Sequence, residues 1–330
     1  MKSPNHTRIL APALQPGDTV GIVAPASNIK RPALEQGCES LQRMGYKPFY
    51  LESIFEQDLY FAGSVERRAG ELEWIFESPE VKAIICARGG YGANHLLREL
   101  DVNKIARNPK IFVGYSDNTT LLTWFADATG LIVFHGPMVT KDFVNEDGVE
   151  TTSWQAALSG QEQWNIPLNP PVTGLSDGSA TAILYGGCLS MLAASLGTPY
   201  EIRTENKILF IEDFAEKPYQ IDRMLMQMKL AGKLDNVRGI IFGEMLDCLQ
   251  TQDQGYTLQE VVRRIIGDIG VPVAYGLRSG HVSRQNITLP IGVKAELQVR
   301  KSEVRLRILE PATSRISMAA ANNGEKSFKA

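Results

Sequence analysis

The fold is decided by the stretch Ile111-Phe-Val-Gly-Tyr-Ser-Asp-Asn-Thr-Thr-Leu-Leu-Thr-Trp-Phe125. Its first five residues are apolar and β-rich, and the apolar residues after Asn118 recur at helical spacing until Gly130. The pattern predicts a buried strand that runs directly into a helix, with Ser116 at the turn. Such a turn presents a serine hydroxyl beside the free N–H groups of the helix start, which suits a nucleophile whose attack creates an oxyanion.

The same turn has a simpler interpretation. The nucleophile elbow of hydrolases usually has a second small residue two positions after the serine, and this chain has Asn118 there. Ser116 or Asp117 also fits the ordinary role of a helix N-cap. The residues of this segment alone leave both interpretations open.

The composition indicates a globular protein that acts on a small molecule. A chain of 330 residues predicts two domains, and 44% hydrophobic with 22% charged residues is typical of a soluble fold. A net charge of -3 gives no electrostatic reason to expect nucleic acid or an anionic membrane as partner. No stretch has the length of a membrane span. Four scattered cysteines, without zinc spacing or a disulfide framework, favour a cytoplasmic location.

The first 150 residues alternate between buried strand patterns and amphipathic helix patterns. Strands are predicted at Asp18–Pro25, Val81–Cys86, Ile111–Tyr115 and Leu131–Phe134. This alternation predicts an α/β domain over residues 1–150, with a mostly parallel sheet covered by helices on both faces. The loops at the carboxyl ends of the strands are expected to hold the site.

The second half of the chain follows a different order. Residues 151–178 are predicted to be a linker, with one short helix near Ser153–Leu158 followed by a stretch rich in proline and glycine. Residues 179–310 mix strands and helices without strict alternation, which predicts an α+β domain with a curved or barrel-like sheet. The small, polar residues of 311–330 predict a disordered tail.

A glycine-rich segment, Gly89-Gly-Tyr-Gly92, follows one of these strands. A dinucleotide fingerprint needs a further glycine at the position of His95, and the Gly-Lys-Ser/Thr of a P-loop is missing. Glycines also let backbone N–H groups approach a reacting carbonyl, as in an oxyanion hole. The alternative is a tight turn.

A serine nucleophile needs a base, and the chain has four histidines: His6, His95, His135 and His281. His6 belongs to the N-terminal segment, and His95 begins a predicted helix where a surface role is ordinary. His135 either lines the site or turns the chain after a strand. His281 lies in a loop between two strands, where catalytic histidines are commonly presented.

The base needs an orienting carboxylate. The apolar strand Lys207–Ile211 ends in Glu212 and Asp213, and Glu216 follows closely. Solvation does not readily explain an acid at the end of a buried strand, so these three are the candidates. For Asp213 we favour the role of a cap on the next helix.

These residues lie within a set of motifs that resembles the LD-carboxypeptidases, serine peptidases that also include the microcin C immunity peptidases. The resemblance spans roughly Gly17 to Leu309. The motifs are Arg88-Gly-Gly-Tyr-Gly92, Gly114-Tyr-Ser-Asp117, Phe134-His-Gly-Pro137, Gly186-Gly-Cys-Leu-Ser190, Leu196-Gly-Thr-Pro199, Phe210-Ile-Glu-Asp213, Gly280-His281 and Leu289-Pro-Ile-Gly292. Where the family usually has asparagine this chain has Cys188, at a predicted helix start.

The resemblance implies a triad of Ser116 as nucleophile, Glu212 as orienting acid and His281 as general base. It also implies an oxyanion hole formed by the backbone N–H groups of Gly90 and Asp117. The implied architecture is a glutamine-amidotransferase-like N-terminal domain with the serine, and a C-terminal domain with the acid and histidine, in a homodimer. The implied reaction removes the terminal D-alanine from murein tetrapeptides in peptidoglycan recycling, without metal or cofactor.

Two other functions compete with this interpretation. An immunity-type peptidase acting on peptidyl- or aminoacyl-adenylates needs an aromatic wall for the adenine, for which Trp154 and Trp164 are available. A non-enzymatic two-domain binding protein would use Ser116 as a ligand contact. For a carboxypeptidase, we expect Arg88 to bind the substrate's terminal carboxylate, because arginine binds carboxylates through two parallel hydrogen bonds. The alternative role of Arg88 is a surface ion pair.

Overall fold

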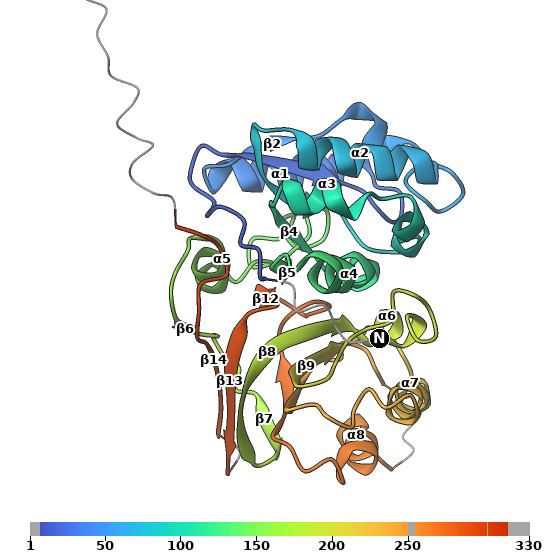
Figure 1. The fold of residues 1–330 in the computed structure, drawn as a ribbon, viewed down its shortest axis with the longest axis vertical. Coiled ribbons are helices and arrows are strands. Elements are labelled where there is room, and N and C mark those ends of the chain that lie inside the picture. Colours follow the sequence, from blue (N-terminus) through green and yellow to red (C-terminus); the bar gives the residue numbers. More distant parts are fainter. Residues whose placement is uncertain (1–6, 250–254, 302, 316–330) are drawn as a thin grey trace, which may run out of the picture.

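The computed structural model describes residues 7–249, 255–301 and 303–315. Two lobes are stacked on each other, and each is built on its own β-sheet (Figure 1). The first sheet has six strands and the second has eight. Both are mixed and open, so the expected mixed α/β fold is confirmed, while the second sheet is not closed into a barrel.

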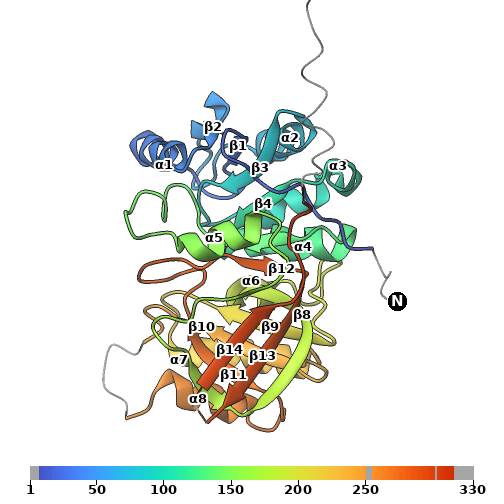
Figure 2. The same ribbon diagram turned by 90° about the vertical axis from the view of Figure 1, so that its left-hand side faces the viewer.

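The first sheet has the strand order β12-β5-β4-β3-β1-β2, and all its neighbours except the β12–β5 pair are parallel. Helix α1 lies on one face of this sheet, and α2 and α3 lie on the other (Figure 2). The strands are β1 (Thr19–Val23), β2 (Lys47–Phe49), β3 (Val81–Cys86), β4 (Ile111–Gly114), β5 (Val133–His135) and β12 (Leu289–Ile291). The helices are α1 (Arg31–Arg43), α2 (Val65–Glu77), α3 (Val102–Arg107) and α4 (Thr119–Thr129).

Local sequence explains the central unit of this sheet. Strand β4 is buried along its whole length, as expected for a parallel strand with both faces covered. Helix α4 ends at Gly130, whose φ of 79° is the left-handed conformation that glycine adopts without steric cost. The helix expected around Leu96 is the 3₁₀ helix η2 (Ala93–Arg98), and β2 was not predicted.

The second sheet has the order β6-β14-β13-β8-β9-β10-β11-β7. Strands β8 to β11 are parallel and are connected through helices, whereas the outer pairs are antiparallel. The strands are β6 (Trp164–Asn165), β7 (Thr173–Ser176), β8 (Gly178–Cys188), β9 (Lys207–Glu212), β10 (Gly239–Gly243), β11 (Val273–Leu277), β13 (Lys294–Arg300) and β14 (Glu303–Ile308). The helices of this half are α5 (Thr151–Leu158), α6 (Leu189–Ala194), α7 (Pro218–Leu230) and α8 (Leu258–Ile266). The sheet curves so far that β7 contacts β14.

Some segments differ from the linear division into two domains. Residues 151–178, for which a linker is predicted, contain α5 and the strands β6 and β7, which form the two edges of the second sheet. Strand β12 comes from the second half of the chain but pairs with β5 in the first sheet. Of the predicted tail, 311–315 is described, and Ser314 exchanges backbone hydrogen bonds with residues 11 and 13; 316–330 lies outside the described residues. The domain boundaries themselves remain a prediction.

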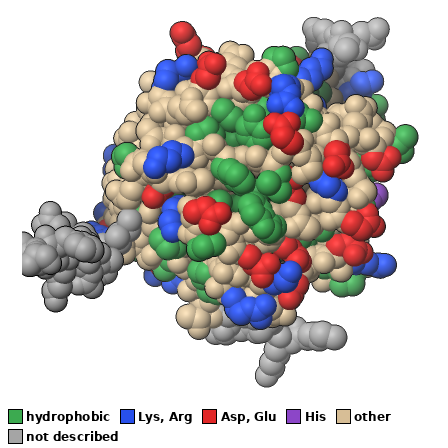
Figure 3. All heavy atoms as spheres, turned by 90° about the horizontal axis from the view of Figure 1, so that it is seen from above, with side chains coloured by type: hydrophobic (Ala, Val, Ile, Leu, Met, Phe, Trp, Pro, Cys, Tyr) green, Lys and Arg blue, Asp and Glu red, His purple; other side chains and the backbone are tan. Residues whose placement is uncertain are grey.

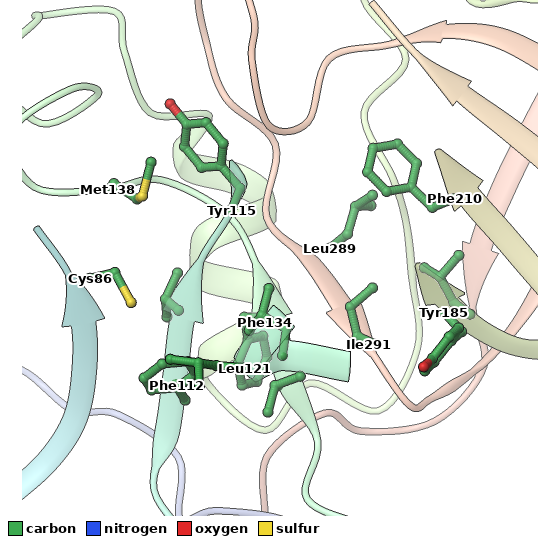
Figure 4. Close-up of a cluster of buried hydrophobic side chains, with 14 of the residues drawn as sticks. Cys86, Phe112, Tyr115, Leu121, Phe134, Met138, Tyr185, Phe210, Leu289 and Ile291 are labelled. Carbon is green, nitrogen blue, oxygen red and sulfur yellow. The ribbon is translucent and has the colours of Figure 1, made fainter. Parts of the chain in front are cut away.

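One hydrophobic core runs through both lobes. Figure 4 shows Phe210, Leu289 and Ile291 from the second half of the chain beside Phe134 and Leu121 from the first. Between the lobes, the Asp127 carboxylate of α4 accepts a hydrogen bond from the Tyr185 hydroxyl (2.6 Å) and pairs with the Lys207 ammonium (3.2 Å). The lobes are therefore joined by packing, by a shared strand and by a half-buried ion pair.

The outer face of the first lobe carries charges of both signs. Viewed from above, acidic and basic side chains surround a central group of hydrophobic side chains (Figure 3). This face therefore has no extended region of a single charge; the absence of a nucleic-acid partner remains a prediction. None of the helices within the described ranges is long and apolar enough to cross a bilayer.

The shared strand predicts a stability effect. Ile291 of β12 is fully buried between the sheets, so Ile291→Ala removes apolar contacts and leaves a cavity. We expect the free energy of unfolding to fall by about 2–5 kcal/mol, measured by urea denaturation. Leu230→Ala is the control, because Leu230 is 82% exposed on α7, and its cost should stay within about 0.5 kcal/mol. Equal effects of the two changes would contradict the role given to β12.

Candidate active site

Ser116 occupies a strained turn between β4 and α4. Its φ is 63°, a left-handed conformation that is uncommon for a residue with a side chain. The short 3₁₀ helix η3 (Ser116–Asn118) then leads into α4. Strain of this kind is characteristic of the turn that exposes a nucleophilic serine, and it persists only where surrounding structure holds it.

Gly89 allows the glycine-rich loop to pass directly beside Ser116. A Cβ atom at position 89 would lie 2.6 Å from the Ser116 Cβ, 2.8 Å from its Oγ and 3.4 Å from the Asp117 nitrogen. No real side chain can occupy that space, so position 89 requires glycine. The family resemblance implies that the adjacent Gly90 belongs to the oxyanion hole; the packing role of Gly89 was not predicted, although the paired glycines pointed to this loop.

The glycine-rich loop is fixed at several points. Gly90 has a φ of 113°, and its N–H makes no hydrogen bond to any described residue, which leaves this donor free. The Asn118 amide donates to the Arg88 carbonyl (3.1 Å), and the Asp117 carboxylate accepts from the Ala93 N–H (2.7 Å). The two residues after the serine therefore hold the loop against the turn. Burial raises the pKa of Asp117 to about 6.

Glu212 ends strand β9 with its side chain completely buried. Two glycines make room for it: a Cβ on Gly243 would lie 2.5 Å from the Glu212 Cβ, and a Cβ on Gly280 would lie 2.6 Å from its carboxyl carbon. A carboxylate removed from water is costly unless it is paired. The partners of Glu212 therefore matter more than its position on the strand.

His281, in the loop after β11, is the main partner of that carboxylate. Its ring Nδ1 lies 2.8 Å from Glu212 Oε2, and its backbone N–H donates to the same oxygen at 3.0 Å. The ring stacks on Phe214 and meets the edge of Tyr115, the residue before Ser116, at 5.0 Å between centroids. The pairing orients the ring so that Nε2 is the nitrogen left for the reaction.

The charges of this pair shift both pKa values. Burial alone raises the pKa of Glu212, but the attraction of His281 and His135 outweighs it and holds that pKa far below its usual range. Burial lowers the pKa of His281, and the charge and hydrogen bond of Glu212 outweigh burial and raise it. Glu212 is thus an anion at neutral pH that stabilises the protonated imidazole of His281.

The described residues contain no hydrogen bond between Ser116 and His281. Catalytic hydrogen bonds commonly tighten only in the complex with substrate, so a longer separation is compatible with a serine and base pair. The structure brings His281 onto Tyr115 beside the serine turn, while the transfer of a proton between the two side chains remains a proposal.

The other candidate residues are not members of the proposed triad. His6 is outside the described residues, His95 is exposed on η2 against Phe61, and His135 is fully buried. No ion pair within the described ranges joins Glu216 to a histidine.

Asp213 is a cap, but on a different helix from the one expected. Its carboxylate accepts hydrogen bonds from the backbone N–H (2.8 Å) and hydroxyl (2.5 Å) of Ser190 in the first turn of α6. It does not cap α7, which follows it in sequence, and instead ties β9 to α6. Cys188 is the N-cap residue of α6, as expected for a position at a helix start.

Arg88, Trp154 and Trp164 are the residues for which ligand contacts were predicted. The Arg88 side chain is exposed beside the glycine-rich loop, and its guanidinium donates to the Asn28 carbonyl at 3.3 Å; its role toward a substrate remains a prediction. Trp154 and Trp164 are buried, with 0% and 7% of their surfaces exposed. The expectation that they are available as an adenine wall is wrong, because both rings are occupied by core packing.

A cavity of about 1060 Å³ adjoins the oxyanion loop. It shares Asp117, Tyr91 and Gly92 with the site region and extends between η2, α4 and the loop after α6. Aromatic rings from Tyr60, Phe61 and Tyr200 line it together with polar groups. No group of three or more histidine, cysteine or acidic side chains in the described ranges is arranged to hold a metal ion.

Comparison with known proteins agrees with this fold. Residues 20–136 match the family model of the LD-carboxypeptidase N-terminal domain, and residues 181–297 match that of the LD-carboxypeptidase C-terminal domain. The chain is 39% identical over 288 residues to a probable murein peptide carboxypeptidase of Bacillus subtilis, covering 86% of this chain and 90% of the relative.

Two further relatives are similar over most of their length. The microcin C7 self-immunity protein MccF of Escherichia coli is 29% identical, with 90% of this chain and 95% of that protein covered. The crystal structure of muramoyltetrapeptide carboxypeptidase from Oxalobacter formigenes superimposes with a TM-score of 0.80 and 28% identity, covering 89% of this chain and all of that one.

The two-lobed fold and the family matches place this chain among the serine peptidases. Within that class, the chain belongs to the LD-carboxypeptidase family.

The Glu212–His281 pair predicts how His281 titrates. In the native protein its ring should titrate above the ordinary value of 6.5. Glu212→Gln removes the charge that raises this pKa and leaves the burial that lowers it, so the midpoint should fall. The measurement is NMR of the histidine ring protons against pH. Glu216→Gln is the matched control and should leave the His281 midpoint unchanged. A shift in Glu216→Gln without a shift in Glu212→Gln would show that Glu212 is not the acid that pairs with His281.

Proposed function

We propose that this protein is a serine LD-carboxypeptidase that removes the terminal D-alanine from murein tetrapeptides during peptidoglycan recycling. The observation that carries the proposal is the buried Glu212–His281 pair packed against the turn that presents Ser116. Relatives named as murein peptide and muramoyltetrapeptide carboxypeptidases support the substrate class. The cavity of about 1060 Å³ beside Asp117 is of the size that ligand sites use and offers room for a short peptide.

The reaction follows from the roles of five groups. Ser116 attacks the carbonyl of the bond before D-alanine, and His281 accepts the hydroxyl proton at Nε2. The N–H groups of Gly90 and Asp117 bind the oxyanion. His281 then protonates the leaving amine, and water releases the acyl group from the serine by the reverse sequence. Glu212 holds the imidazole in one tautomer and stabilises its protonated form.

We assign recognition of the free terminal carboxylate to Arg88. Its exposed guanidinium lies on the residue before the loop glycines, and it is bound only to a carbonyl in the described residues, so it can turn to a carboxylate. A carboxylate offers two oxygens in the plane that the guanidinium matches.

We also propose that the enzyme acts in the cytoplasm and as a homodimer. All four cysteines are free thiols in the structure, which fits a reducing compartment. Leu59, Tyr60 and Tyr91 expose large apolar surfaces beside the cavity, and a second copy would cover them. Sedimentation velocity measures the oligomeric state directly.

The triad should act as a unit, because a serine is a weak nucleophile without its base and the base is poorly oriented without its acid. Ser116→Ala, His281→Ala and Glu212→Ala should each lower kcat by several powers of ten in a folded protein, and the double variants should lose little more. The measurement is kcat on a tetrapeptide ending in D-alanine, with circular dichroism as the folding control. If the fold reductions in kcat of the single variants multiplied in the double variants, the three residues would not act as one triad.

Substrate recognition should depend on the terminal carboxylate. A tetrapeptide ending in D-alanine should be cleaved with a kcat/KM on the order of a hundredfold higher than the same peptide amidated at its C-terminus, because a charge-assisted contact to the carboxylate is lost. The L-alanine peptide should also be slow, since inversion turns either the methyl or the carboxylate away from its pocket. Comparable rates on all three peptides would reject the LD-carboxypeptidase assignment.

Two further assays sharpen that comparison. Arg88→Ala should make the kcat/KM values of the acid and amide peptides similar. Arg43→Ala, on the exposed end of α1, should preserve the difference between them. Cleavage of an aminoacyl-adenylate analogue without cleavage of the tetrapeptide would instead indicate that the protein is an immunity-type peptidase.

A further inference from the structure

A second histidine faces the triad acid from the opposite lobe. His135 is the last residue of β5 in the first sheet, where it is in register with Gly114 of β4 and Leu289 of β12. Its Nε2 lies 3.6 Å from Glu212 Oε1, and both side chains are completely buried. The proposed triad does not use this residue, so its contact with the acid requires a separate explanation.

The two oxygens of Glu212 have different environments. Oε2 accepts both hydrogen bonds from His281. Oε1 has no hydrogen-bond partner among the described residues, and the same is true of His135 Nε2. These two unpaired buried atoms face each other across the boundary between the lobes. At 3.6 Å their contact is an electrostatic pair slightly longer than a hydrogen bond.

The other nitrogen of His135 defines where its protons lie. Nδ1 is 3.1 Å from Ser279 Oγ, and the Ser279 hydroxyl also lies 2.8 Å from the Ile287 carbonyl. When the single hydroxyl proton of Ser279 is donated to Nδ1, the ring hydrogen of His135 lies on Nε2. Two lone pairs facing each other in a buried space would repel. A hydrogen on Nε2, directed at Glu212 Oε1, removes that repulsion.

The surroundings hold this arrangement in place. Tyr115 and Phe210, both labelled in Figure 4, pack against the His135 ring at centroid distances of 5.9 and 5.1 Å. A Cβ on Gly280 would lie 2.7 Å from His135 Cε1 and 2.6 Å from the Glu212 carboxyl carbon, so the glycine lets the two side chains close on each other. The titratable groups around the pair are His281, Tyr115, Asp142, Asp213, Cys188 and Cys248.

We propose that His135 is a positioning residue, which holds Glu212 Oε1 so that Oε2 is offered to His281. The His135 N–H also partly compensates the negative charge of Glu212, so that the carboxylate raises the pKa of His281 less than it would alone. This inference rests on the proposed triad, because it assigns His135 a function through Glu212 and His281. The low pKa of Glu212, which reflects both histidines, is consistent with it.

Two substitutions separate the hydrogen donated to Glu212 from the shape of the ring. His135→Phe keeps the ring packing against Tyr115 and Phe210 but leaves Oε1 without a partner. His135→Gln places a side-chain N–H close to the position of Nε2 and keeps a donor for Oε1. The readouts are kcat and KM on the tetrapeptide, the pH dependence of kcat/KM, and the NMR titration of the His281 ring.

We expect His135→Phe to lower kcat by about ten- to a hundredfold, because one buried oxygen of the carboxylate then faces no donor, with KM changed less than about threefold. The His281 midpoint and the acid limb of kcat/KM should move to higher pH, because the whole charge of Glu212 then acts on His281. His135→Gln should recover most of kcat.

Other outcomes overturn the proposal. Unchanged kcat and an unchanged His281 midpoint in a folded His135→Phe variant would show that His135 does not act on the acid. Equal losses in the phenylalanine and glutamine variants, with the same fall in melting temperature, would show a packing role only. The NMR titration needs no substrate, so it tests His135 even if wild-type protein does not cleave the tetrapeptide, a result that would instead reject the proposed function.

Discussion

A fully buried carboxylate is the constraint on which this structure depends. Glu212 cannot be removed from water at tolerable cost unless positive or hydrogen-bonding groups surround it. The second sheet carries the carboxylate at the end of β9 and supplies His281 from the loop after β11, while the first sheet supplies His135 from the end of β5. The contact with His135 forms only when the two lobes are correctly placed against each other.

The chain secures that placement in several ways at once. Strand β12 leaves the second half of the chain and becomes the antiparallel edge of the first sheet. The hydrophobic core continues from Phe134 to Phe210 without a break, and the cluster of Asp127, Lys207 and Tyr185 adds polar contacts between α4 and the second sheet. Relative movement of the lobes would break all of these contacts together, so the buried pair is held by the whole interface.

The candidate site contains several local features that are unfavourable on their own. Ser116 adopts a positive φ, Gly89 and Gly280 stand where any side chain would collide with Ser116 or Glu212, and a buried carboxyl oxygen lacks a hydrogen bond. Each feature costs stability in isolation. Their concentration around one serine and one carboxylate is what is expected of a site whose geometry is set by function and maintained by the surrounding fold.

Local pattern was enough to determine the elements around the site. The apolar run before Ser116, the glycine-rich loop and the acid that ends an apolar strand each follow from periodicity and turn chemistry within a few residues, and the structure has them at those places. The sequence also predicted the α/β class of the first lobe, because strands and helices alternate there as parallel β-α-β units require.

Only the tertiary structure determined the strand pairings, the burial and the side-chain contacts that involve residues distant in sequence. Strands β6, β7 and β12 are short, and their sheet membership depends on which edge is available for pairing. Trp154 and Trp164 carry no local sign that they are buried, and His135 has none of its contact with Glu212. Residues 135 and 212 meet only after both sheets have formed and packed, because burial and charge pairing are properties of the assembled interface rather than of any segment of the chain.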